Sequence, residues 1–198
     1  RPLAVRLPHR RQHFVFSDVI LMPDFVEAAR QVKSQKSNFV LLSQRWDYDI
    51  SVSLDFFGDW ISRLRSSVLG QNQLHRPAGS DFFLFPKACY TDIPNFAIGR
   101  AGWDNWMIYK ARKEGWPVID CTPSMMIVHQ NHDYSHLPGG QSHHEHPDTN
   151  ENIRLAGGQA NVQAGAGDQG VGCLLPEPVP DRRPAQGNRI VAAVFPVA

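Results

Sequence analysis

Short apolar runs alternate with segments of helical periodicity along most of this 198-residue chain. Each run is compact and rich in aromatic or β-branched residues, which predicts strands at 14–21, 38–43, 81–85, 117–121 and 125–129. Apolar residues recur every three to four positions in three other segments, which predicts helices after Pro23, over 54–68 and over about 103–114. Gly70 and Gly115 follow two of these helices as stop signals. This alternation indicates an α/β domain with a largely parallel sheet.

Aromatic residues divide the chain into a body and a tail. All but one of the Phe, Trp and Tyr residues lie between Phe14 and Tyr134, and large aromatics supply much of a core's buried area. We therefore expect a packed body over residues 14–161 and a basic leader or remnant over 1–13. Residues 162–198 are rich in Gly, Ala, Gln and Pro, which predicts a low-complexity, poorly ordered tail. The apolar run Ile190–Val197 is an exception that could dock on the body.

Composition narrows the possible partners and the compartment. The chain has 20 Lys and Arg against 19 Asp and Glu, so its charge gives no reason to expect nucleic acid or an anionic membrane as a partner. No run reaches the roughly 20 apolar residues of a transmembrane span. Three cysteines without CxxC spacing argue against a disulfide framework. A reducing, cytoplasmic location is the expectation.

A carboxylate emerges from the first predicted strand segment. Asp18 comes at the end of the apolar run that begins at Phe14. Ligands of open α/β sheets bind outside the carboxyl ends of strands, where an Asp can hold a metal that neutralises phosphates. The alternative is a turn or a helix cap before Pro23.

Two further acidic segments allow a binding role or a structural one. Asp47 and Asp49 stand beside Arg45 and Trp46 directly after the second strand, where they could bind a cation or a sugar, or pair with the arginine. Asp81 begins the third strand, where it is either part of a site or an acid hydrogen-bonded to a turn and solvent.

The segment Gly99–Trp106 combines glycines, Arg100 and an acid flanked by two tryptophans. Asp104 falls in the first turn of the next helix, where it either stabilises the helix dipole or acts as a general base. Trp103 and Trp106 could offer a platform for a sugar ring. Apolar flanks desolvate a carboxylate, so we expect them to raise the pKa of Asp104.

Histidines cluster late in the body. Six of the nine fall within residues 129–146, but they lack an HExxH pattern, which disfavours a dedicated zinc hydrolase. His129 or His132, at the end of the last strand, is a candidate to complete a metal site begun by Asp18.

The body resembles the nucleotide-diphospho-sugar transferase (GT-A) fold, and within it the family-2-like glycosyltransferases. The resemblance covers about 14–161 and is carried, in order, by FSDVI at 16–20, SQRWD at 43–47, DFFLF at 81–85, PNFAIGR at 94–100, WDNW at 103–106 and HQNHDY at 129–134. It implies transfer of a sugar from a nucleotide-sugar donor to a glycan or other hydroxyl acceptor, by an inverting mechanism assisted by Mn²⁺ or Mg²⁺.

The resemblance also implies roles for individual residues. Asp104 matches the base that deprotonates the acceptor, Asp18 matches the metal-binding acid, and His129 or His132 matches the histidine that completes the metal shell. The expected substrate-binding residues are Arg45, Trp46, Asp47, Asp81, Arg100, Trp103 and Trp106.

Two departures from the family lead to further expectations. Only about 13 residues precede Phe14, so most of the Rossmann-like nucleotide-binding half is expected to be missing, and the altered composition after residue 161 suggests a fragment or a frameshift. The chain by itself is therefore either a transferase or a fragment of one. The alternative is a non-catalytic carbohydrate- or protein-binding module derived from such an enzyme.

Overall fold

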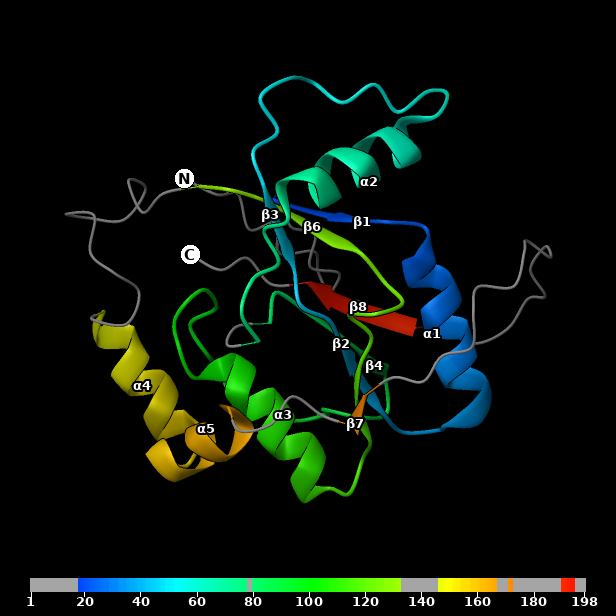
Figure 1. Cartoon of the computed structure of the whole chain (residues 1–198). Coiled ribbons are helices and arrows are strands. Elements are labelled where there is room, and N and C mark those ends of the chain that lie inside the picture. Colours follow the sequence, from blue (N-terminus) through cyan, green and yellow to red (C-terminus); the bar gives the residue numbers. More distant parts are fainter. Residues whose placement is uncertain (1–17, 78–79, 133–145, 167–170, 173–189, 195–198) are drawn as a thin grey trace, which may run out of the picture.

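The computed structural model describes residues 18–77, 80–132, 146–166, 171–172 and 190–194, which form a mixed α/β structure (Figure 1). The helices are α1 (Asp24–Gln35), α2 (Trp60–Gln71), α3 (Trp103–Lys113), α4 (Pro147–Leu155) and α5 (Gln159–Ala166). The strands are β1 (Val19–Leu21), β2 (Val40–Leu42), β3 (Trp46–Tyr48), β4 (Phe82–Pro86), β5 (Val118–Asp120), β6 (Ile127–Gln130), β7 (Val171–Gly172) and β8 (Ile190–Val194).

The strands form two sheets, with the orders β1-β6-β3 and β7-β5-β2-β4-β8. Both are mixed. In the larger sheet Leu41 pairs with Ile119 in a parallel ladder on one side and with Leu84 in an antiparallel ladder on the other. In the smaller sheet β6 pairs antiparallel with β1 and parallel with β3. The prediction of a largely parallel sheet is therefore wrong, because an apolar run does not encode the direction in which its strand lies beside a neighbour.

Helices α1 and α3 follow the sequence prediction. Pro23 has a helical φ of −58° directly before α1, where its missing N–H is harmless. The apolar face of α1 buries Ala28, Ala29 and Val32, as expected. Helix α3 ends before Gly115, whose φ of +69° takes the backbone out of the helix.

Helix α2 begins later and ends later than predicted. Its first residue is Trp60, so the segment from 54 to 59 is loop, and Phe57 in it is 84% exposed. Gly70 lies within the helix, which ends instead at Asn72 in the left-handed conformation. The prediction failed because an apolar residue at helical spacing in an exposed loop cannot be distinguished from one on a helix face.

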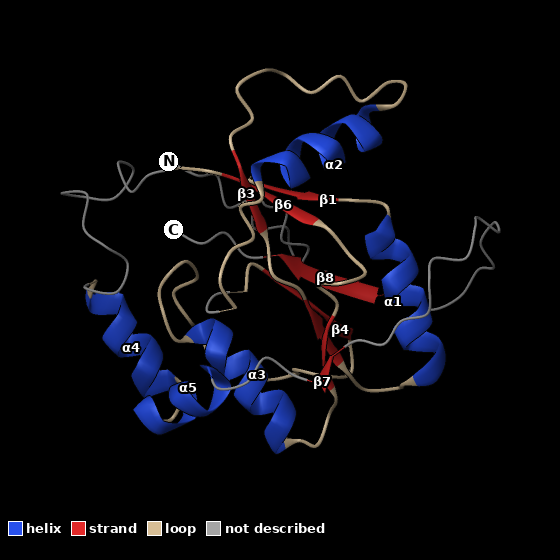
Figure 2. Cartoon of the chain, in the orientation of Figure 1, coloured by secondary structure: helices blue, strands red, loops and turns tan. Residues whose placement is uncertain are grey.

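The core consists of three clusters of buried side chains. One lies between β2, β4 and α3, another involves α1 with β2 and β4, and the third joins α2 to the smaller sheet. In Figure 2, α3, α4 and α5 group together on one side of the molecule, whereas α1 and α2 lie on other sides. Helices therefore lie against the two sheets from several directions.

The C-terminal part of the chain contributes to this body. Helix α5 crosses residue 161 and continues to Ala166. Strand β8 pairs antiparallel with all five residues of β4, so part of the apolar run Ile190–Val197 docks on the larger sheet. The remainder of the expected tail lies mostly outside the described residues. None of the described helices combines the length and the apolar character that a membrane span requires.

Candidate functional site

Three strand segments bring the acidic and histidine residues together. In the smaller sheet β6 lies between β1 and β3, and His129 of β6 pairs with Val19 on one side and with Asp47 on the other. Asp18 directly precedes β1, so it too reaches this edge. Residues that are more than a hundred positions apart in sequence therefore converge here.

Asp18, His129 and His132 form a group that could hold a metal ion. The Nε2 atoms of His129 and His132 lie 4.0 Å and 3.6 Å from Oδ2 of Asp18. One candidate ligand atom from each residue lies within 4.8 Å of the others. The sequence suggested that either histidine would complete the site, and the structure brings both to it.

Unpaired polar atoms indicate that this group fits a cation. Among the described residues, Oδ1 of Asp18 and both ring nitrogens of His129 are buried without a hydrogen-bond partner. His129 is only 3% exposed. Buried polar atoms without partners are costly, and a bound cation would satisfy the carboxylate and one imidazole nitrogen at once. An aspartate and two imidazoles are a familiar ligand set for divalent transition metals.

A charged network adjoins the group. Arg45 lies between Asp47 and Asp81, with Nε 2.8 Å from Oδ1 of Asp47 and Nη1 2.5 Å from Oδ2 of Asp81. His75 Nδ1 lies 2.9 Å from Oδ2 of Asp47. Burial acts to raise the pKa of Asp47, but contacts with His129 and His75 and the charge of Arg45 outweigh it and hold the pKa well below its usual value. Asp47 is therefore a firmly ionised centre of the network.

His75 was not a candidate from the sequence. It lies in the loop after α2, where His75 N donates a hydrogen bond to Arg45 O at 2.9 Å. His75 stands alone between Leu74 and Arg76, and no spacing pattern in the sequence connects it to Asp47. Only the tertiary structure identifies it as part of the network.

Asp81 is a buried acid and not the solvated turn residue that was one alternative. Its side chain is 1% exposed, and its only hydrogen-bond partner among the described side chains is Arg45. Burial raises the pKa of Asp81, although the guanidinium beside it acts in the opposite direction. A substrate-binding role for Asp81 stays a prediction.

Asp104 lies in the first turn of α3, where Asn105 N donates to Oδ1 at 2.8 Å. Burial raises its pKa, and the negative charge of Asp81 raises it further, whereas backbone N–H groups at the helix start act to lower it. The expected direction of the shift is therefore confirmed.

The turn before Asp104 is held by a buried amide. Asn152 of α4 is fully buried, accepts from Ala97 N at 2.9 Å and donates to Ala97 O at 2.9 Å and Ala101 O at 3.2 Å. Gly102 then starts α3 with a φ of +104°, which an L side chain rarely adopts. Asn152 thus fixes the turn that positions Asp104, a role that sequence reasoning missed because nothing local in α4 reveals it.

The tryptophans have other surroundings than expected. Trp103 and Trp106 are 4% and 7% exposed and pack edge-on or tilted against core rings, including Phe83 and Phe96. Their indoles therefore do not form an accessible sugar platform in this structure, because Trp103 and Trp106, three positions apart in α3, lie on the helix face that packs against the core. Trp46 is partly buried against the core beneath α2.

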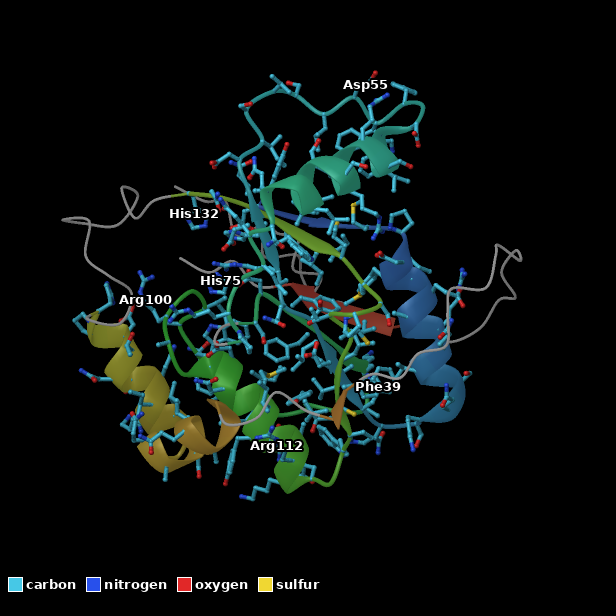
Figure 3. All side chains as sticks on the ribbon, viewed as in Figure 1. Phe39, Asp55, His75, Arg100, Arg112 and His132 are labelled. Carbon is cyan, nitrogen blue, oxygen red and sulfur yellow. The ribbon has the colours of Figure 1, made fainter. Side chains whose placement is uncertain are left out.

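Arg100 is half-buried in the turn before α3, where Nη1 donates to Gly99 O at 3.0 Å while its buried Nε has no hydrogen-bond partner among the described residues. Figure 3 shows Arg100, His75 and His132 on the same side of the molecule. The candidate residues thus form a connected series, from the Asp18 group through Asp47 and Arg45 to Asp81.

Comparison with protein-family models, with curated proteins and with solved structures gave no match. The function therefore has to be argued from the geometry of the site and from the sequence motifs.

Proposed function

We propose that this chain carries the metal-binding and acceptor-activating side of an enzyme that transfers a glycosyl group from a nucleotide sugar to a hydroxyl. One observation carries the proposal: a metal-ligand group at Asp18 adjoins the charged network of Asp47, Arg45 and Asp81, and the charge of Asp81 helps to raise the pKa of Asp104. Such a transfer needs a cation for the diphosphate leaving group and a base for the acceptor. The sequence motifs that resemble family-2-like glycosyltransferases support the same reading.

The ligand set bears on the metal. Asp18, His129 and His132 would hold the ion, which when bound would neutralise the charge that develops on the departing diphosphate. Two imidazoles suit Mn²⁺ better than Mg²⁺, which prefers oxygen ligands and retains its water. Mn²⁺ is therefore the favoured ion of the two expected from the sequence.

Asp104 would serve as the base. It would take the proton of the acceptor hydroxyl as the hydroxyl oxygen bonds to the anomeric carbon and the bond from that carbon to the diphosphate oxygen breaks, with inversion. A raised pKa makes the carboxylate a stronger proton acceptor than an ordinary aspartate. The charge of Asp81 would favour the proton's arrival at Asp104.

A binding module without catalysis is a second candidate, and the loop before α2 favours it. Phe56 and Phe57 in this loop are 61% and 84% exposed. Exposed aromatic rings are typical of surfaces that bind a sugar or a protein. This reading requires no base and no donor.

The two candidates are separated by titration of the chain with UDP- and GDP-sugars in the presence of Mn²⁺, followed by a transfer assay. We expect nucleotide binding that requires Mn²⁺, and we expect Asp104→Asn to reduce transfer about 10²- to 10⁴-fold while Mn²⁺ binding is unchanged. The exposed Asp92→Asn variant is the control. Retained transfer in Asp104→Asn would exclude the base, and Mn²⁺ binding without nucleotide binding would favour the binding module.

A further inference from the structure

His129 lies between two carboxylates that approach its two ring nitrogens. Its Nε2 lies 4.0 Å from Oδ2 of Asp18, and its Nδ1 lies 3.4 Å from Oδ1 of Asp47. The side chain is 4% exposed, so water does not compete freely for either nitrogen. Because the nitrogens of an imidazole point in different directions, Asp47 lies on the side of the ring away from the candidate metal ligands.

We infer that Asp47 is a positioning residue for the metal site: its carboxylate, beside Nδ1 of His129, favours the proton on that nitrogen and thereby leaves Nε2 to bind the ion. The inference rests on the metal site of the proposed function. A metal-ligating histidine commonly donates its second N–H to a carboxylate, which fixes the tautomer and the ring orientation and increases the basicity of the ligating nitrogen. This role differs from the sugar contact that the sequence suggested for Asp47.

Asp47 is itself held firmly enough to orient another side chain. Its Oδ1 lies 2.8 Å from Arg45 Nε and its Oδ2 lies 2.9 Å from His75 Nδ1. Arg45 is in turn anchored to the buried Asp81 at 2.5 Å. A carboxylate that is contacted by two cationic or donor groups besides His129 has few alternative rotamers.

The backbone supports the same arrangement. Asp47 and His129 are paired residues of the parallel ladder between β3 and β6. Their side chains therefore emerge from neighbouring positions of one sheet, and their separation is set by the sheet and not by a flexible loop. Asp49, two residues further along the chain, is exposed and is not a member of the metal-ligand group. It provides a matched control.

The test compares Mn²⁺ affinity by isothermal titration calorimetry in the 198-residue wild-type chain and its variants. We expect Asp47→Asn to weaken Mn²⁺ binding about 10- to 100-fold, the usual cost of losing such a partner. We expect Asp49→Asn to bind as the wild type does. His75→Gln removes only one support of Asp47, so it should cause a smaller loss and provides a milder variant should Asp47→Asn fail to fold.

A second readout does not depend on affinity. With diamagnetic Zn²⁺ as the probe, nitrogen NMR of the wild type should show His129 protonated at Nδ1 and metal-bound at Nε2. The Nδ1–H proton resonance should shift in Asp47→Asn or His75→Gln, but not in Asp49→Asn. If Asp47 had only a structural role, it would not determine which ring nitrogen of His129 carries the proton.

Failure of the inference and failure of the metal site can be distinguished. If His129→Ala and Asp18→Asn abolish Mn²⁺ binding while Asp47→Asn and His75→Gln bind as tightly as the wild type, Asp47 has no positioning role. A His129 that binds Zn²⁺ through Nδ1 would overturn the inference in the same way. If His129→Ala and Asp18→Asn leave binding intact, or the wild type binds no Mn²⁺, the metal site itself is wrong.

Discussion

At the scale of single residues, Asp104 has an unfavourable environment in the folded chain. Its carboxyl is desolvated and faces the charge of Asp81, and both effects raise its pKa above the ordinary value of 3.8. Such an acid destabilises the fold once it ionises, and strained or desolvated groups of this kind concentrate at functional sites. Asp104 can therefore be tested by its effect on stability as well as by its effect on activity.

We predict that Asp104→Asn increases the free energy of unfolding at neutral pH. A carboxyl whose folded pKa is raised is ionised first in the unfolded chain, so its contribution to stability falls as the pH rises from about 4 through the folded pKa. In Asp104→Asn, the free energy of unfolding should not show this decline between about pH 4 and the folded pKa of Asp104. Urea unfolding at several pH values measures it, with the exposed Asp92→Asn as the control.

A decline that is equally steep in Asp104→Asn and in the wild type would contradict the prediction. Combined with a loss of transfer activity, a gain in stability would be the trade-off expected of a functional carboxylate.

Some residues of the site could be predicted from the sequence, and others could not. Asp18, Asp47 and His129 were candidates because acids and histidines at strand ends carry chemistry in α/β folds. His75 and Asn152 were not candidates, because neither lies at the end of a predicted strand and only folding brings them to partners 28 and 55 positions away along the chain. Contacts of that kind are set by how loops and helices pack.

At the scale of elements, α3 carries Asp104 and is fixed from its outer side by α5. Arg112 of α3 donates from Nη1 to Ala164 O of α5 at 2.8 Å. A Cβ added at Gly165 would lie 1.9 Å from Asn105 O, so the two helix backbones are in direct contact there. Only glycine permits this close approach.

We predict opposite effects for two glycine substitutions. Gly165→Ala should lower the free energy of unfolding by about 1–3 kcal/mol, because the added methyl group forces α5 away from α3. Gly70→Ala in α2 should raise it by about 0.5–1 kcal/mol, because alanine favours a helix interior and no atom lies within 4 Å of its Cβ. Chemical denaturation of both variants measures the difference, and equal effects would mean that the helix contact is absent.

The elements also show where hydrophobic patterning is a reliable guide. Helix α1 was predicted correctly because its apolar face is buried and Pro23 marks its start. The start of α2 was missed because Phe57 is apolar and exposed. Apolar periodicity predicts a helix correctly where the apolar residues are buried, and it fails where an apolar residue such as Phe57 is exposed.

At the scale of the whole molecule, β8 closes the edge of the larger sheet. It pairs with β4 in a register that runs from Phe82 opposite Val194 to Pro86 opposite Ile190. Without it, β4 would present unpaired N–H and C=O groups along an apolar strand, which favours association with other chains. β8 therefore covers the edge of β4, the strand that follows Asp81.

We predict that a chain ending at Arg189 is less stable than one ending at Val194. The shorter chain loses the β4–β8 ladder, in which each backbone hydrogen bond contributes about 0.5–1.5 kcal/mol. It should unfold at lower urea concentration, with faster hydrogen exchange of the β4 amides. The chain ending at Val194 keeps every pair and is the matched control; identical exchange in the two would contradict docking of β8.

The sequence by itself determined the α/β class, most of the strands and two of the helices, and it singled out the acids of the site together with His129 and His132. Local apolar runs, caps and stop signals encode these, because they depend on burial and on neighbouring residues. Only the tertiary structure decided the strand directions, the inward orientation of Trp103 and Trp106, and the network that joins Asp47 to His75. These depend on contacts between distant segments, whose geometry no local pattern records.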